Sequence, residues 1–119
     1  MIRIRTLTRA SEYDAAVDLE RKVWGWTDVE LFPAPMFVVV NRIGGQSFGA
    51  YDEDRMAGFC VALPALKPNG MHYLHSHMLA VLNEYQNQGI GRRLKLRQRE
   101  DALARGISRI EWTFDPLEI

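Results

Sequence analysis

Residues 71–105 change from an apolar run to a run of helix-forming residues at a polar segment that ends in Gly89, and this change limits the folds open to the chain. Residues 71–81, MHYLHSHMLAV, form an apolar run suited to a strand in the middle of a sheet. Residues 90–105 are mostly strong helix formers, and Gly106 is a suitable end for that helix. The polar segment 83–89 lies between them. The sequence therefore predicts a central strand, a tight corner and a helix in direct succession.

The other segments predict further strands and helices around this unit. Ser11 and Asp14 match a capping box at the start of a helix, and Gly25 can end it. Residues 35–43 favour a short helix after Pro35, although three consecutive valines also suit a strand. We expect strands at 2–7 and 108–114, hairpin strands at 46–51 and 56–63, and a loop at 64–70.

Each of the two long helices should have one mostly apolar face. On the first helix this face consists of Tyr13, Ala16, Val17, Glu20 and Trp24. On the last helix it consists of Ile90, Leu94, Leu96, Leu103 and Ile107.

Length and charge exclude several classes of protein. The 119 residues suit one domain, 1–119, with 47% hydrophobic and 25% charged residues, which is ordinary globular composition. Fifteen Lys and Arg balance fifteen Asp and Glu, so no overall basic field attracts nucleic acid or a membrane surface. No apolar run approaches the roughly 20 residues that span a bilayer, and no signal peptide is recognisable. We expect a cytoplasmic location.

Cysteine and histidine usage argues against a metal site or an internal disulfide. Cys60 is the only cysteine, and no Cys and His residues have the spacing of a zinc site. Cys60 lies in the apolar run FCVAL, which is typical of a buried small side chain. We expect no bound metal.

The corner before the last helix has the features of an anion site. The first N–H groups of a helix lack partners within the helix, and glycines at 89 and 91 let a ligand approach the backbone. Five cations follow in the first turns, where each opposes the helix dipole by about 0.3–1 kcal/mol unless an anion is bound. They are Arg92, Arg93, Lys95, Arg97 and Arg99. A solvated basic face, partly balanced by Glu100 and Asp101, remains the alternative.

Two common phosphate motifs do not fit this corner. A P-loop ends in Gly-Lys-Ser/Thr, whereas Gly91 is followed by two arginines. The dinucleotide motif needs a third glycine or alanine at the position of Leu94. A different phosphate-binding arrangement is required.

Residues 86–91, QNQGIG, resemble the Gln/Arg-x-x-Gly-x-Gly/Ala signature of the GNAT superfamily of acyl-CoA-dependent N-acyltransferases. The expected order of strands and helices over almost the whole chain is also similar to that family. HSHMLAV (75–81) and TFDPLE (113–118) look like a bacterial branch of poorly assigned acetyltransferases. The resemblance implies an α/β fold with a mixed, mostly antiparallel central sheet flanked by helices.

The resemblance also implies how acetyl-CoA, without a metal, is held as a co-substrate. Backbone amides from Asn87 to Arg92 would hold its pyrophosphate, and residues 79–81 would offer backbone hydrogen bonds to the pantetheine arm. An amide near Leu79 would polarise the thioester carbonyl. The implied binding residues are Leu79, Ala80, Val81, Gln86, Asn87, Gln88, Gly89, Ile90, Gly91 and Arg92.

The catalytic candidates are two histidines on the central strand. Attack of an amine on a thioester requires removal of a proton, and histidine titrates near neutrality. His75 falls where some family members carry a catalytic glutamate, and His77 should share its face, whereas His72 should face the other way. A sheet histidine that only satisfies a hydrogen bond is the alternative. Glu84 is interpreted as a loop residue.

The amine would enter over the first two helices and the loop between them. Trp24 and Trp26 could line its pocket or simply pack in the core, and Asp28 and Glu30 could attract a cationic small-molecule or peptide amine.

The family normally continues past the fifth strand with a helix and two strands, and that helix supplies a tyrosine to protonate the leaving thiolate. The given sequence ends at Ile119. The resemblance therefore implies that these elements are lacking here. Either the sequence is a fragment of a longer protein, or a homodimer or a swapped oligomer covers the exposed edge. The two functional hypotheses are an N-acetyltransferase and a catalytically incomplete CoA-binding or dimerising module.

Overall fold

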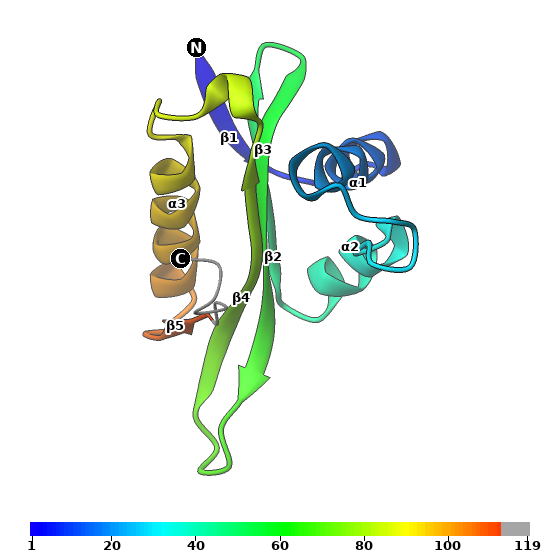
Figure 1. Cartoon of the computed structure of the whole chain (residues 1–119). Helices are drawn as coiled ribbons and strands as arrows, with labels where there is room; N and C mark the ends of the chain where they lie inside the picture. The colour runs from blue at the N-terminus through cyan, green and yellow to red at the C-terminus, as the bar shows by residue number, and fades with distance from the viewer. Residues whose placement is uncertain (113–119) are drawn as a thin grey trace, which may run out of the picture.

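The structure, a computed structural model, describes residues 1–112. These residues form one five-stranded sheet with helices on both faces (Figure 1). The elements in chain order are β1 (Ile2–Thr6), α1 (Ala10–Trp24), α2 (Ala34–Arg42), β2 (Gln46–Asp52), β3 (Arg55–Leu66), β4 (His72–Val81), a short 3₁₀ helix (Asn83–Tyr85), α3 (Ile90–Ala104) and β5 (Ile110–Glu111).

The sheet has the strand order β1-β2-β3-β4-β5. The first three pairs are antiparallel, and β5 runs parallel to β4. The mixed, mostly antiparallel α/β fold expected from the sequence is therefore confirmed. The parallel pair is short, because only Leu74 and His75 of β4 face β5 residues. From Ser76 onward β4 has no neighbouring strand on that side within residues 1–112.

The helices cover the two faces of the sheet unequally. The helices α1 and α2 lie on one face and α3 lies on the other, as Figure 1 shows. Phe37 of α2 and Phe59 of β3 are fully buried in the larger core, under α1 and α2. Phe48, Ile90 and Leu94 belong to the second core, under α3. Each face of the sheet thus has its own hydrophobic core, and β4 contributes side chains to both.

The first helix begins and ends through local backbone contacts. Its capping glutamate is Glu12, which accepts hydrogen bonds from the backbone N–H groups of Thr8 at 2.9 Å and Arg9 at 3.1 Å. The capping box predicted at Ser11 and Asp14 is therefore wrong, because the helix already starts at Ala10. The predicted end at Gly25 is confirmed by its left-handed φ of 65°.

The structure decides between helix and strand for the valine-rich segment. Residues Ala34–Arg42 form a helix, and Phe37 and Val40 are its buried side chains. The helix starts after Pro33, whose fixed φ suits an N-terminal position. The helix prediction is confirmed, with a start one residue earlier than expected.

The strand β3 is longer than the sequence predicts. The expected loop at 64–70 is wrong at its start, because Pro64 pairs with Leu74 and the strand continues to Leu66. Proline lacks an N–H and is tolerated where a strand has a free edge. The strand β2 pairs with β3 only as far as Ala62, so Pro64 lies beyond the doubly paired part of β3.

The predicted contact face of α3 is partly wrong. Leu96 and Leu103 are exposed, at 40% and 55% of their surface, whereas the buried residues recur every four positions. They are Ile90, Leu94, Gln98 and Ala102. Gln98 belongs there because its amide donates to the Ser76 hydroxyl at 3.3 Å. A polar residue thus occupies a position that a hydrophobic stripe does not predict.

The last predicted strand is confirmed only in part. It was expected over 108–114, and the structure assigns Ile110–Glu111 to β5. Residues 113 and 114 and the fragment TFDPLE lie outside the described residues. No helix within residues 1–112 has the length and apolar character to cross a bilayer.

Candidate active site

The corner between β4 and α3 is lined by backbone N–H groups without protein partners. Asn87 and Gly89 have left-handed φ angles of 65° and 76°, so the chain turns sharply into α3. The first hydrogen bond of the helix joins the Arg93 N–H to the Gly89 carbonyl at 3.0 Å. Among residues 1–112, none accepts a hydrogen bond from the backbone N–H groups of residues 87–92. Such a concave set of donors at a helix N-terminus is suited to an anion.

Side chains hold this corner against the end of β4. The Gln86 amide donates to the Val81 carbonyl at 3.3 Å and to the Asn83 side chain at 3.4 Å. Glu84 forms an ion pair with Arg55 at 2.9 Å. These contacts explain Gln86 and Glu84 as supports of the corner, and they leave its backbone donors open.

Gly91 is not required by the fold itself. A Cβ at this position would lie 3.6 Å from Leu79 Cδ2, which is an ordinary van der Waals contact. Gly45 differs, since a Cβ there would lie 2.5 Å from the Ala62 carbonyl oxygen. The small residue at 91 keeps open the space beside β4, and nothing in the packing of the described residues demands it.

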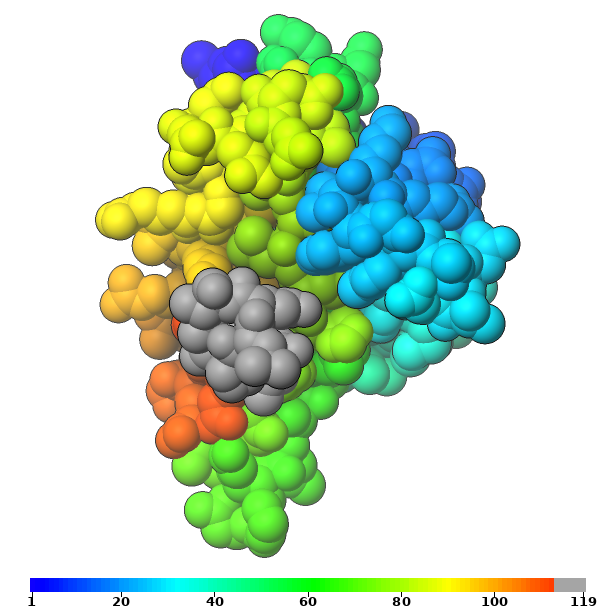
Figure 2. All heavy atoms as spheres, viewed as in Figure 1, coloured from blue at the N-terminus to red at the C-terminus, as the bar shows by residue number. Residues whose placement is uncertain are grey.

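A cleft of about 1030 Å³ separates the open edge of β4 from α3 and β5. Its walls include Leu79, Gly91, Ile107 and Trp112. A second hollow of about 390 Å³ continues past the corner and shares Leu79 and Gly91 with the first. Figure 2 shows β4 between α1 on one side and the corner with α3 on the other. The donors of the corner therefore open into a long groove along β4.

Alternation along β4 decides which backbone groups face this groove. The Leu82 N–H donates to the Ala57 carbonyl at 2.9 Å, so Leu82 directs its backbone toward β3. In an antiparallel pair this direction alternates, which turns Ala80 toward Phe59 of β3 as well. Leu79 and Val81 direct their N–H and C=O groups away from β3, into the groove. Ala80 lines the smaller hollow without offering backbone hydrogen bonds to it.

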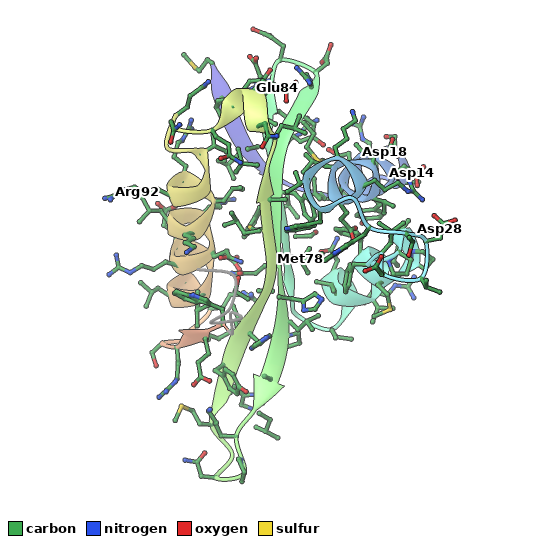
Figure 3. The ribbon with its side chains drawn as sticks, viewed as in Figure 1. Asp14, Asp18, Asp28, Met78, Glu84 and Arg92 are labelled. Carbon is green, nitrogen blue, oxygen red and sulfur yellow. The ribbon has the colours of Figure 1, made fainter. Side chains whose placement is uncertain are left out.

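The cations of α3 divide into two sets. Arg93 donates to the Ile2 carbonyl at 2.9 Å, and the guanidinium of Arg97 lies 5.2 Å from the centre of the Phe48 ring. Arg92, Lys95 and Arg99 line the cleft instead. Figure 3 shows Arg92 extending outward from α3, on the opposite side of the sheet from Asp14, Asp18 and Asp28. The basic side of the molecule therefore borders the groove.

A β-bulge separates the two histidines from the donor end of β4. Val61 pairs with Met78 and Ala62 pairs with Ser76, so His77 is the extra residue on β4. His77 remains accessible at the mouth of the cleft, yet its ring packs against Phe32, with centroids 5.3 Å apart. Burial lowers the pKa of His77, and positive charge on neighbouring His75 lowers it further. An imidazole in this state is neutral near pH 7 and can accept a proton.

The family model described as the acetyltransferase (GNAT) family matches residues 9–117. This chain belongs to the GNAT acetyltransferase family. No sequence of a curated protein gives a significant match.

Solved structures with the same fold include several acetyltransferases. An aminoglycoside acetyltransferase from an uncultured soil metagenomic sample, in complex with trehalose, superposes with a TM-score of 0.86 at 16% identity, covering 98% of this chain and 80% of that one. Glucosamine-6-phosphate N-acetyltransferase from Arabidopsis thaliana gives 0.76 at 15% identity, with 99% and 85% covered. Ribosomal-protein-alanine N-acetyltransferase from Brucella melitensis biovar Abortus 2308 gives 0.73 at 15% identity, with 98% and 82% covered.

In this GNAT chain the loop between α1 and α2 lies on the opposite face of the sheet from α3 (Figure 1). Trp24 and Trp26 stack on each other with ring centroids 4.6 Å apart. The Asp28 carboxylate pairs with Arg21 at 3.2 Å, and Glu30 accepts hydrogen bonds from the Thr27 N–H and hydroxyl at 2.9 Å. The predicted acidic residues thus have roles inside the loop, although Asp28 is still largely exposed.

The sequence alone did not indicate that Glu20 of α1 and Phe32 of this loop act together. Glu20 was placed on the inner face of α1, but its fully buried carboxylate accepts a hydrogen bond from the Phe32 N–H at 2.7 Å. Phe32 in turn packs against His77. A charged residue in an otherwise apolar helical stripe was the one available signal for Glu20. No group of three or more possible metal ligands occurs within residues 1–112.

Proposed function

We propose that the chain is an N-acetyltransferase that transfers the acetyl group of acetyl-CoA to a primary amine. The observation that carries this proposal is the set of open backbone N–H groups at residues 87–92, placed beside the free edge of β4. A diphosphate satisfies such donors, and an extended amide chain satisfies a free strand edge. Acetyl-CoA contains both groups in one molecule.

The coenzyme would run from the corner along β4. The N–H groups of residues 87–92 would hold the pyrophosphate, with Gln86 supporting the corner and Arg92 adding positive charge at its rim. Leu79 and Val81 would exchange backbone hydrogen bonds with the pantetheine arm. We assign Ala80 a packing role only, since its backbone faces β3. An N–H group such as that of Leu79 would stabilise negative charge developing on the thioester oxygen.

The two histidines would handle the proton of the amine. The neutral amine nitrogen bonds to the thioester carbon, the carbon–sulfur bond breaks, and the thiolate leaves with the electron pair. We propose that His75, which pairs with Glu111 of β5, takes the proton directly or through water, and that His77 lies at the mouth of the cleft. Burial and positive charge on His75 both lower the pKa of His77, which favours its neutral form.

Cationic or polyhydroxylated amines are the acceptors that we propose to test first. The outer surface of α1 and the following loop carries Asp14, Asp18 and Asp28, well separated from the cations of α3 (Figure 3). Acceptors in the names of structural relatives are aminoglycosides and glucosamine 6-phosphate, and one relative contains bound sisomicin. These amino sugars are therefore the first compounds to test.

Self-association and a cytoplasmic location also stay predictions. Within residues 1–112, β5 pairs only with β4, which leaves its outer edge available to a second copy. Light scattering at micromolar concentration should give a mass above that of one chain, and a strictly monomeric mass would contradict this prediction.

The central experiment measures binding and turnover separately. Acetyl-CoA is titrated into the full chain by calorimetry, and release of CoA thiol is then followed with sisomicin, glucosamine 6-phosphate and a peptide with N-terminal alanine. Saturable binding with amine-dependent thiol release is the expected result. Binding without turnover on any amine would support a coenzyme-binding module instead, and no binding would contradict both.

A further inference from the structure

Glu20 is a buried carboxylate whose hydrogen bond joins α1 to the loop before α2. Its side chain has no exposed surface, and Oε1 accepts the Phe32 N–H at 2.7 Å. Oε2 is buried without a hydrogen bond from any described residue. Burial raises the pKa of Glu20, although the bond from Phe32 and the charge of Arg21 oppose that shift. Such a residue costs stability and therefore calls for an explanation beyond packing.

The hydrogen bond ties together two segments that are not adjacent in the chain. Glu20 lies near the end of α1, and Phe32 is the second-last residue before α2 begins at Ala34. A hydrogen bond to an ionised acceptor is about twice as strong as one between neutral groups. A carboxylate therefore anchors this end of the loop more firmly than an amide could.

The ring of Phe32 connects the hydrogen bond of Glu20 to His77 at the mouth of the cleft. It meets Phe37 of α2 edge-on, with centroids 5.2 Å apart, and it packs against the imidazole of His77 at 5.3 Å. Phe37 is fully buried, so it fixes the ring from the core side. On the other side the ring limits the positions open to His77. Glu20, Phe32 and His77 thus form a continuous chain of contacts from α1 to the mouth of the cleft.

We propose that Glu20 is a positioning residue for the acceptor side of the cleft, acting through Phe32 on the imidazole of His77. This inference deepens the proposed function and rests on it, since His77 lines the cleft in which acetyl transfer is proposed. Glu20 itself touches neither substrate. Its buried charge maintains a geometry that would otherwise depend on the weaker contacts of the loop.

The direct test follows the imidazole of His77 by NMR, which requires no turnover. In Glu20→Leu the Phe32 N–H loses its acceptor, so we expect the His77 ring signals to shift and the His77 pKa to rise toward its ordinary value as the ring becomes more exposed. Phe32→Leu should produce the same shift with Glu20 intact. Glu20→Gln keeps a neutral acceptor and should give an intermediate result.

Glu12 provides a matched control on the same helix. It is also buried, but it holds the start of α1 through Thr8, Arg9 and Arg5, away from the cleft. Glu12→Gln should change stability and leave the His77 signals and pKa unchanged. Unaltered His77 signals in a folded Glu20→Leu protein would overturn the proposal, whatever Phe32→Leu shows. If Glu20→Leu does not fold, Phe32→Leu and Glu20→Gln decide the question.

The kinetic test uses whichever amine of the panel gives the highest turnover. Glu20→Leu should raise the KM for that amine about tenfold, the loss expected for a hydrogen bond to a charged group, at unchanged affinity for acetyl-CoA. Glu20→Gln should recover part of the loss. An unchanged KM for the amine would count against the positioning role. If the wild-type chain turns over no amine, the proposed acetyl transfer fails, while the NMR result still decides the role of Glu20.

Discussion

Gly89 and Gly106 lie at the two ends of α3 with nearly the same backbone angle, φ of 76° and 78°. Among residues 1–112, apart from each glycine and its chain neighbours, no heavy atom lies within 4 Å of the position that a Cβ would take at either glycine. Replacement by alanine therefore carries the same conformational penalty at both ends and no clash. The two residues differ in one respect, because only Gly89 belongs to the corner with open N–H groups.

This pair separates coenzyme binding from stability. We expect Gly89→Ala and Gly106→Ala each to lower the free energy of unfolding by about 1–2 kcal/mol, since L-residues disfavour the left-handed region. Only Gly89→Ala should weaken acetyl-CoA binding in calorimetry, by about tenfold or more, because it disturbs the donors around the pyrophosphate. Equal affinities in the two variants would argue against the corner as the binding site.

The division of the α3 cations predicts unequal effects of two neighbouring arginines. Arg92→Gln should weaken acetyl-CoA binding about two- to fivefold, as expected for an exposed charge pair, and should reduce its salt dependence. Arg93→Gln changes the net charge equally but removes only the contact with the Ile2 carbonyl. Calorimetry at two salt concentrations distinguishes them, and an equal loss in both variants would mean that overall charge, rather than the groove, attracts the coenzyme.

The histidines predict a characteristic pH profile. If His75 is the base, His75→Ala should reduce kcat about a hundredfold or more, at unchanged affinity for acetyl-CoA, and should remove the acidic limb of the rate profile. His77→Ala should have the smaller effect on kcat. Burial and the charge of His75 lower the pKa of His77, so that ring is neutral near pH 7. A reversed order of the two variants would assign the base to His77.

Two buried glutamates on α1 should affect stability with opposite signs. Burial in the folded state raises the pKa of Glu20. The protonated side chain therefore contributes stability that is fully present below the ordinary pKa of 4.5 and is lost as pH rises through the pKa of the folded state. Glu20→Gln should therefore be more stable than wild type at pH 7.5, with a gap that narrows toward pH ~4.5. Urea denaturation at both pH values measures this gap.

Glu12 gives the opposite expectation in the same assay. Burial opposes its ionisation, but hydrogen bonds from Thr8 and Arg9 outweigh that cost and the pKa of Glu12 is lowered. Its stabilising contribution is present above 4.5 and lost as pH falls through the folded pKa. Glu12→Gln should be less stable than wild type at pH 7.5. The same sign for Glu12→Gln and Glu20→Gln at pH 7.5 would contradict this account of the two carboxylates.

Cys60 should behave as an inert core residue. It has no exposed surface, and burial raises the pKa of its thiol to about 12. We expect iodoacetamide at pH ~8 to leave the native protein unmodified and to alkylate it fully in urea, because only the thiolate reacts. Rapid labelling of the native chain, followed by mass spectrometry, would show that this part of the sheet opens.

The sequence alone determined the features that depend on local chemistry. The corner at residues 83–89, the helix after it and the end of α1 at Gly25 all follow from glycine, proline and helix-forming residues acting on their own neighbourhood. The QNQGIG signature placed the chain in its family. Such features need no knowledge of distant contacts.

Only the tertiary structure decided the features that depend on pairing across the sheet. The strand β3 can continue through Pro64 because β2 does not pair with β3 beyond Ala62. The bulge at His77 arises from the register of β4 on β3. Neighbours also determine which arginines reach the groove and which backbone groups of β4 remain open. These outcomes depend on contacts such as Ala62 with Ser76 and Arg93 with Ile2, which are 14 and 91 positions apart, so no local pattern contains them.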